Sequence, residues 1–180
     1  EKMSKSVGNV VDPVDMANAY GVDQLRYFLM RDVSFGQDGS YSHEAIVTRC
    51  NAELANSFGN LAQRSLSMIF KNLDGEISNA WVHQQADIDL HNRVMDACRN
   101  ELPQQFEALS FSVGIEDWMR AVFACNQYVD EMAPWALRKT DPERMTAVLN
   151  TLFMCVRALA IAIQPVVPGS AAKLLDQPLA

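Results

Sequence analysis

The sequence has 180 residues, of which 49% are hydrophobic and 21% charged, a balance typical of a globular domain that excludes a disordered chain. The length allows one domain, or one domain and a fragment of a second. Its net charge of -7 excludes a surface that attracts nucleic acid by bulk charge, so any RNA contact must come from a local patch or from base stacking.

The first eight residues predict a phosphate-binding loop. Lys2 and Lys5 are separated by Met3 and Ser4, and Gly8 follows closely. Small side chains and a nearby glycine favour a loop over a helix. Two ammonium groups on such a loop suit a polyanion, because each lysine is a compact, mobile charge. A frayed basic terminus has the same composition, so the following residues have to decide between the two.

Two short helices and a loop are predicted next. Asn9–Val11 carries two β-branched residues and is read as a short strand. Asp12 can cap a helix that opens on a proline, and Gly21 can end it. A second helix begins at Val22, and the turn-forming residues over 32–41 predict a loop.

Longer helices make up the rest of the chain. The first runs from Ser42 to about Lys71 without a proline. Its apolar residues recur mostly at steps of three and four: Ile46, Cys50, Leu54, Phe58, Leu61, Leu66 and Ile69. Later helices are predicted from about Ala86 with a kink at Pro103, from Ile115 to Met132, from Asp141 to Ile163 and over 168–175. Pro134 and Trp135 follow the end of one of them.

These elements predict an all-α fold, with an antiparallel helical bundle over residues 42–180 and a small leading segment over residues 1–41. Met119, Met145 and Trp118 lie on apolar faces, so we expect them in the core. The four cysteines form no Cys-x-x-Cys pair and predict buried free thiols in a reducing cytosol. The scattered histidines predict no metal site, and the longest apolar run, 158–163, is too short to span a bilayer.

A resemblance to a known family gives these patterns a common meaning. Residues 2–9 resemble the KMSKS signature of class I aminoacyl-tRNA synthetases, and Asp12-Pro13, 20–23 and 25–29 resemble the segment that follows it in the class Ia branch. Residues 35–39, 56–64 and 133–135 are similar to the methionyl-tRNA synthetases of bacterial type. The leucyl, valyl, isoleucyl and cysteinyl relatives, and a non-catalytic tRNA-binding helical module, remain the alternatives.

The resemblance implies an ATP-dependent ligase that joins methionine to its tRNA through methionyl-adenylate, using ATP with Mg²⁺. The loop Lys2, Met3, Ser4, Lys5 and Ser6 would bind ATP, with Lys2 and Lys5 catalytic. Mobile ammonium groups that meet the charge developing on pyrophosphate would lower the barrier without tightening ground-state binding. The sequence opens inside the motif, so the nucleotide fold is expected upstream and this piece alone is expected to be inactive.

The resemblance also assigns the bundle to anticodon binding, through Asn60, Arg64, Pro134 and Trp135. Asn60 and Arg64 are four residues apart on a predicted helix and share a face, and Trp135 can stack on a splayed base. Without the resemblance, all three would be ordinary surface or bundle-end residues. Phosphate contacts are expected from Lys71, Arg138 and Lys139. The implied partner is the methionine tRNA, with a cytoplasmic, monomeric enzyme and no membrane.

Overall fold

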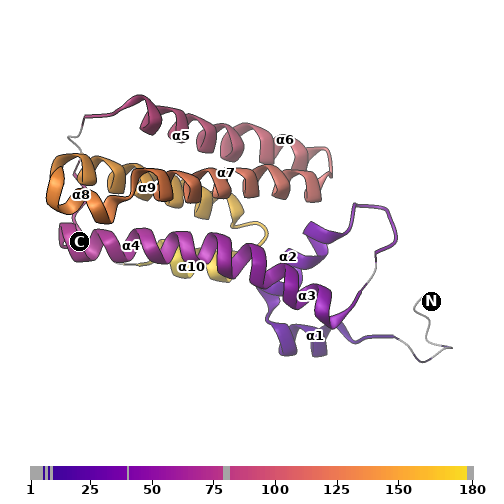
Figure 1. The fold of residues 1–180 in the computed structure, drawn as a ribbon. Helices are drawn as coiled ribbons and strands as arrows, with labels where there is room; N and C mark the ends of the chain where they lie inside the picture. The colour runs from indigo at the N-terminus through magenta and orange to yellow at the C-terminus, as the bar shows by residue number, and fades with distance from the viewer. Residues whose placement is uncertain (1–5, 7, 9, 40, 79–81, 178–180) are drawn as a thin grey trace.

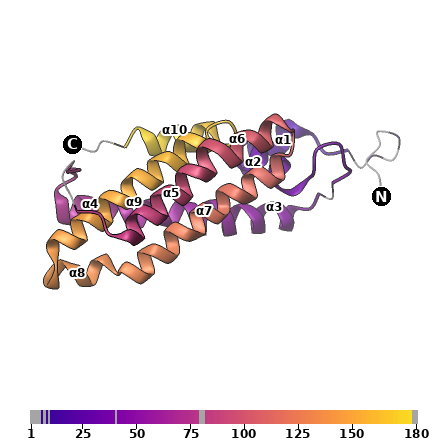
Figure 2. The ribbon, with the colours of Figure 1, turned by 90° about the horizontal axis from the view of Figure 1, so that it is seen from above.

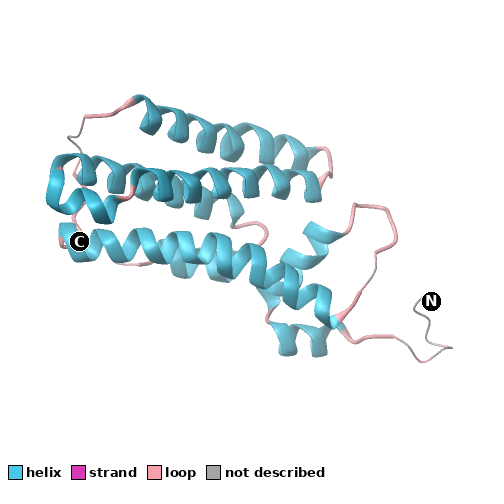
Figure 3. Cartoon of the chain, in the orientation of Figure 1, coloured by secondary structure: helices cyan, strands magenta, loops and turns pink. Residues whose placement is uncertain are grey.

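The chain is seen in a computed structural model that describes residues 6, 8, 10–39, 41–78 and 82–177. Every regular element in these residues is a helix (Figures 1 and 3). The all-α prediction is therefore confirmed. Val10 and Val11 form no strand, so that expectation is wrong, while Asn9 lies outside the described residues. Two β-branched residues do not make a strand when no described segment pairs with them.

Two short helices open the described chain. The helix α1 (Pro13–Tyr20) begins as predicted, because the Oδ1 atom of Asp12 accepts a hydrogen bond from the Val14 backbone N–H at 2.7 Å. Gly21, at φ 94°, joins it to α2 (Val22–Asp32). A positive φ of this kind favours glycine. These two helices lie at one end of the molecule in Figure 1.

The long helix predicted from Ser42 is present and runs through three pieces: α3 (His43–Arg49), the π-helical segment η1 (Cys50–Gly59) and α4 (Asn60–Leu73). Ser42 caps it by accepting a hydrogen bond from the Ala45 N–H at 3.0 Å. The π-helical geometry was not predicted. Its signal in the sequence is the four-residue spacing from Ile46 to Phe58, which would drift by about 40° per step in a regular α-helix.

The remaining helices complete an up-and-down bundle: α5 (Gln85–Asp96), η2 (Ala97–Glu101), α6 (Leu102–Glu107), α7 (Phe111–Met132), α8 (Pro134–Thr140), α9 (Pro142–Ile163) and α10 (Pro168–Leu175). The consecutive long helices run in opposite directions, and α8 lies at the end opposite α1 and α2 (Figures 1 and 2). Pro103 lies in α6 directly after η2, inside a helix that continues from α5, because Glu101 before α6 keeps helical backbone angles (φ −61°, ψ −56°).

The bundle core is centred on Trp118, which is fully buried. Its indole Nε1 donates to the Leu159 carbonyl at 3.0 Å, and its ring meets Phe58 edge to face at 4.9 Å. Met119 and Met145 are buried with it, which confirms that these residues belong to the core. All four cysteines are free, and three of them are buried.

The core continues across the expected boundary at residue 41. Tyr27 of α2 belongs to the main core, while Phe28 packs with Ile46 and Cys50 in a smaller one. The division into 1–41 and 42–180 therefore stays a prediction. The helix α9 is long and apolar enough to cross a membrane, with 61% of its most apolar window buried inside the protein. A central core helix has this same composition.

Candidate nucleic-acid interface

Two of the predicted anticodon-binding residues lie at the start of α4. Asn60 is the first residue of this helix, and Arg64 stands one turn further along. Both are exposed, and among the described residues the Asn60 side chain has no hydrogen-bond partner in the protein. Its amide therefore keeps both donor and acceptor groups available. The two side chains share a helix face, as the four-residue spacing predicts.

The other two predicted residues belong to a helix that the sequence did not predict. Pro134 and Trp135 open α8, whereas we expected Trp135 to follow a helix end without structure of its own. Ala133, at φ 44°, turns the chain by adopting the left-handed conformation between α7 and α8. Proline fits the first turn of a helix because it needs no hydrogen-bond partner there. Pro134 is buried, while Trp135 is 55% exposed.

Arg64 brings these two helices together. Its guanidinium carbon lies 5.9 Å from the centre of the Trp135 ring, in cation–π range. Its Nη2 atom also donates to Asp130 Oδ1 at 3.0 Å, from the last turns of α7. The fold therefore places Arg64 and Trp135 side by side at an exposed surface. A planar fork beside an indole can hydrogen-bond and stack an unpaired base.

Asp130 was missed by sequence reasoning. It carries no motif and becomes notable only because α7 lies next to α4. Its side chain is 67% exposed and that of Arg64 43%, so the pair contributes only about 0–1 kcal/mol to stability. The effect of Asp130 is on orientation. Its carboxylate binds one amino group of the Arg64 guanidinium and so directs the plane of that group.

A second group of polar and charged residues, the Glu53 cluster, was also not predicted from the sequence. It consists of Glu53 with Tyr27, Arg31 and Arg49. The Glu53 carboxylate accepts from Tyr27 Oη at 2.6 Å, from Arg31 Nε at 3.0 Å and from Arg49 Nη1 at 3.0 Å. Arg31 also pairs with Glu116 of α7. The cluster ties α2 to η1 and α7, so it joins the leading helices to the bundle.

The pKa values in this cluster follow from its contacts. Burial works to raise the pKa of Glu53, but hydrogen bonds from Tyr27 and Arg31 outweigh it and hold that pKa below the ordinary range. Burial and the hydrogen bond to Glu53 raise the pKa of the Tyr27 hydroxyl. Glu53 is therefore an anion at neutral pH, and Tyr27 is a neutral donor to it.

The predicted ATP loop lies mostly outside the described residues. Lys2, Met3, Ser4 and Lys5 are not described, and Ser6 is an exposed turn residue. Lys71, Arg138 and Lys139 are all exposed, as phosphate contacts must be. Among the residues that the structure describes, no three His, Cys, Asp or Glu side chains are grouped to hold a metal ion.

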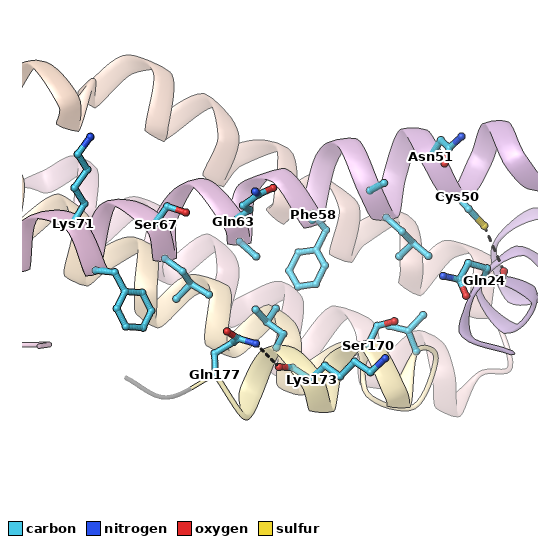
Figure 4. A pocket seen from close by; sticks show the side chains of 18 residues that line it. Gln24, Cys50, Asn51, Phe58, Gln63, Ser67, Lys71, Ser170, Lys173 and Gln177 are labelled. Carbon is cyan, nitrogen blue, oxygen red and sulfur yellow. Dashed lines mark hydrogen bonds between the residues drawn. The ribbon is translucent and has the colours of Figure 1, made fainter. Parts of the chain in front are cut away.

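A large groove lies elsewhere on the described part of the chain. It has a volume of about 960 Å³ and runs between the long helix and α10 (Figure 4). Apolar side chains such as Phe58, Leu66 and Leu174 line much of it, with Lys173 and Gln177 on the α10 side. Neither Asn60, Arg64 nor Trp135 lines it. The candidate site is therefore an exposed helix face and not this groove.

Comparisons with known proteins agree on one family. The family described as "tRNA synthetases class I (M)" matches residues 1–66, and "Anticodon binding domain of methionyl tRNA ligase" matches residues 77–178. Proteins named methionine–tRNA ligase from Brucella suis and Mycobacterium tuberculosis are 51% and 49% identical over 98% of the chain. In both cases the chain spans 34% of the relative's length.

A solved structure gives the same result. The methionyl-tRNA synthetase of Mycobacterium tuberculosis, in complex with methionyl-adenylate, superposes with a TM-score of 0.92 at 49% identity. The match covers 98% of this chain and 35% of that protein. The likeness therefore concerns about a third of a longer protein.

Proposed function

Because the chain belongs to the methionyl-tRNA ligase family, whose anticodon-binding domain matches residues 77–178, we propose that it is the tRNA-reading part of a methionine–tRNA ligase. The complete protein would join methionine to ATP, release pyrophosphate, and pass the methionyl group to its tRNA. The single observation that carries the proposal is the placement of Arg64 beside Trp135 at an exposed surface. Trp135 belongs to α8, the helix at the end of the bundle away from α1 (Figure 1).

The physical case for anticodon reading rests on these two side chains and on Asn60. An exposed indole can stack a loop base, a contact worth about 1–3 kcal/mol per base. Arg64 presents a planar fork and Asn60 a donor and an acceptor, which suit the edges of unpaired bases. None of these contacts needs a basic surface, which is consistent with the net charge of -7. Lys71, Arg138 and Lys139 would add phosphate contacts.

The lysines near the start would act in the first chemical step. Lys5 would meet the negative charge that develops on the departing pyrophosphate, and Lys2 would assist it. ATP with Mg²⁺, methionine and the methionine tRNA are the substrates that we propose for the complete protein. The match to class I synthetases over residues 1–66 supports this assignment. The free cysteines support a reducing cytosol, where we propose a monomer.

The test is Trp135→Ala in the complete protein. We expect aminoacylation efficiency to fall by about 10- to 100-fold, because one stacked base is lost. ATP–pyrophosphate exchange should stay within about two-fold, because this reaction needs no tRNA. A ten-fold change would require a barrier higher by about 1.4 kcal/mol. Initial rates of both reactions measure this.

A matched control separates the role of Trp135 from the loss of any exposed aromatic ring. Phe70 lies on α4, is 43% exposed and lines the groove instead of the candidate site. Phe70→Ala should leave aminoacylation nearly unchanged. Equal losses in aminoacylation and in pyrophosphate exchange for Trp135→Ala would reject anticodon reading by this residue.

A further inference from the structure

A buried ionic cluster lies under the corner where α7, α8 and α9 meet. It consists of Asp87 of α5, Tyr128 of α7 and Arg144 of α9, and we call it the Asp87 cluster. Asp87 is 0% exposed, Tyr128 4% and Arg144 9%. Charged side chains are seldom buried so deeply unless they are paired. None of these three residues belongs to the exposed face described above.

The carboxylate of Asp87 is fully used. Arg144 donates to both of its oxygens, at 2.6 Å and 2.7 Å, in a two-pronged contact. The Tyr128 hydroxyl donates to Oδ1 at 2.5 Å, and the Gln84 backbone N–H donates to Oδ2 at 2.9 Å. A carboxylate offers about four acceptor positions, so this one ties α5 to α7 and α9 and also fixes the start of α5.

The cluster reaches both ends of α8 through Arg144. At the first end, Arg144 Nη2 donates to the sulfur of Met132 at 3.4 Å, and Met132 is the last residue of α7. At the second end, the Arg144 backbone N–H donates to Asp141 Oδ1 at 3.0 Å. The Asp141 N–H in turn donates to the Leu137 carbonyl of α8 at 2.8 Å.

The helix α8 needs such support. It has only seven residues and is entered through Ala133 in the left-handed conformation. A helix this short does not hold itself in water, so its position is set by its packing against α9 and by what fixes its two ends. A two-pronged arginine–carboxylate contact fixes orientation as well as distance. Trp135 stands on the first turn of α8, so its distance from Arg64 depends on the same contacts.

We propose, resting on the anticodon-reading function above, that Asp87, Tyr128 and Arg144 are positioning residues that hold α8 so that Trp135 stands beside Arg64. They touch no RNA themselves. They act by fixing the end of α7 and the start of α9, which α8 connects while it packs against α9. Weakening the cluster should therefore loosen anticodon recognition and leave the amino-acid activation step untouched.

The decisive experiment uses Tyr128→Phe in the complete enzyme, because this change removes one hydroxyl and keeps the ring. We expect KM for the methionine tRNA to rise by about 2- to 30-fold, with kcat and pyrophosphate exchange unchanged. Discrimination against a tRNA with an altered anticodon should fall. An unchanged KM would overturn the proposal, provided that circular dichroism shows the fold retained.

The double variant with Trp135→Ala tests the route of the effect. If Tyr128 acts through Trp135, the double variant should have the same KM for tRNA as Trp135→Ala alone. Independent, multiplying effects would overturn the positioning role. A failure of the proposed function looks different, because Trp135→Ala itself would then leave aminoacylation unchanged.

A matched control removes general loss of stability as the explanation. Leu102 is 3% exposed at the start of α6, at the end of the bundle away from α8 (Figure 1). Leu102→Ala should lower the Tm at least as much as Tyr128→Phe and leave KM for tRNA unchanged. An equal rise in KM for both variants would assign the effect to stability and reject the proposal.

Discussion

Arg64 is engaged by two neighbours of different character. Asp130 takes one hydrogen bond from its guanidinium, and the Trp135 ring lies 5.9 Å from its central carbon. The carboxylate directs the plane of the fork, and the ring supports one side of it. The remaining donors are free to meet a base edge. Arginine and lysine would not be equivalent here, because only arginine offers a planar fork that can stack.

Replacing Arg64 with lysine tests whether shape or charge matters. For Arg64→Lys we expect KM for the methionine tRNA to rise by about ten-fold. An arginine can form two hydrogen bonds to a base edge and stack on it, whereas a lysine can form one and cannot stack. Arg138→Lys, an exposed control on α8, should change KM by less than two-fold, since a phosphate contact needs only the charge. Equal effects in the two variants would argue that Arg64 contacts phosphate and not a base.

Lys5 concerns the other chemical step and lies outside the described residues. For Lys5→Ala in the complete protein, the adenylation rate should fall by about 10²- to 10³-fold while KM for ATP changes little, because the contact forms in the transition state. Single-turnover formation of methionyl-adenylate measures this. Lys71→Ala, which removes an exposed lysine from α4, should leave that rate unchanged. An unaltered rate in Lys5→Ala would remove this lysine from the mechanism.

At the scale of elements, two buried carboxylates connect helices that the chain places far apart. Glu53 joins η1 to α2, and Asp87 joins α5 to α7 and α9. Burial works to raise the pKa of Asp87, but hydrogen bonds from Arg144 and Tyr128 outweigh it and lower that pKa overall. Both carboxylates thus have lower pKa values folded than unfolded. Their stabilisation is present above the ordinary carboxyl range and is lost as the pH falls through and below it.

Low pH should therefore lower the stability of the fold, and protonation of Glu53 should account for part of this loss. The urea midpoint of the chain should drop steeply between about pH 5 and pH 3. Glu53→Gln should be less stable at pH 6 by about 1–3 kcal/mol, since hydrogen bonds to a charged group are weakened, while Arg31 keeps Glu116 as a partner. Its midpoint should depend less on pH over that range. A variant with the full acid sensitivity of the original chain would contradict the low pKa.

For the whole molecule, the sequence was informative where the cause of structure is local. Asp12 caps the helix that it was expected to cap, and Ser42 and Asp141 cap the helices that were predicted to begin at them. The apolar stripes place Trp118 and Met119 in the core. What it could not reveal depends on distant partners. The contacts of Asp130, Glu53 and Asp87 join residues far apart in the chain, and no local pattern marks them.

The candidate site, too, was predicted from the sequence only in part. The family resemblance pointed to Asn60, Arg64, Pro134 and Trp135, and the structure brings Arg64 and Trp135 together. The helix α8 was not foreseen, because a seven-residue helix that opens with a proline just after another helix looks like a helix end. Which of these residues contacts RNA stays a prediction that the variants above decide.

The π-helical segment η1 implies that the long helix tolerates changes of length unevenly. A turn that closes from residue i to i+5 holds one residue more than an α-helical turn. Removing one residue between Cys50 and Gly59 could thus be absorbed by converting such a turn to α-helix, with Asn60 and Arg64 still facing the same way. Removing one residue from α4 between Asn60 and Arg64 would instead turn all later residues by about 100°. Natural deletions in this helix should therefore fall before Asn60 and not after it.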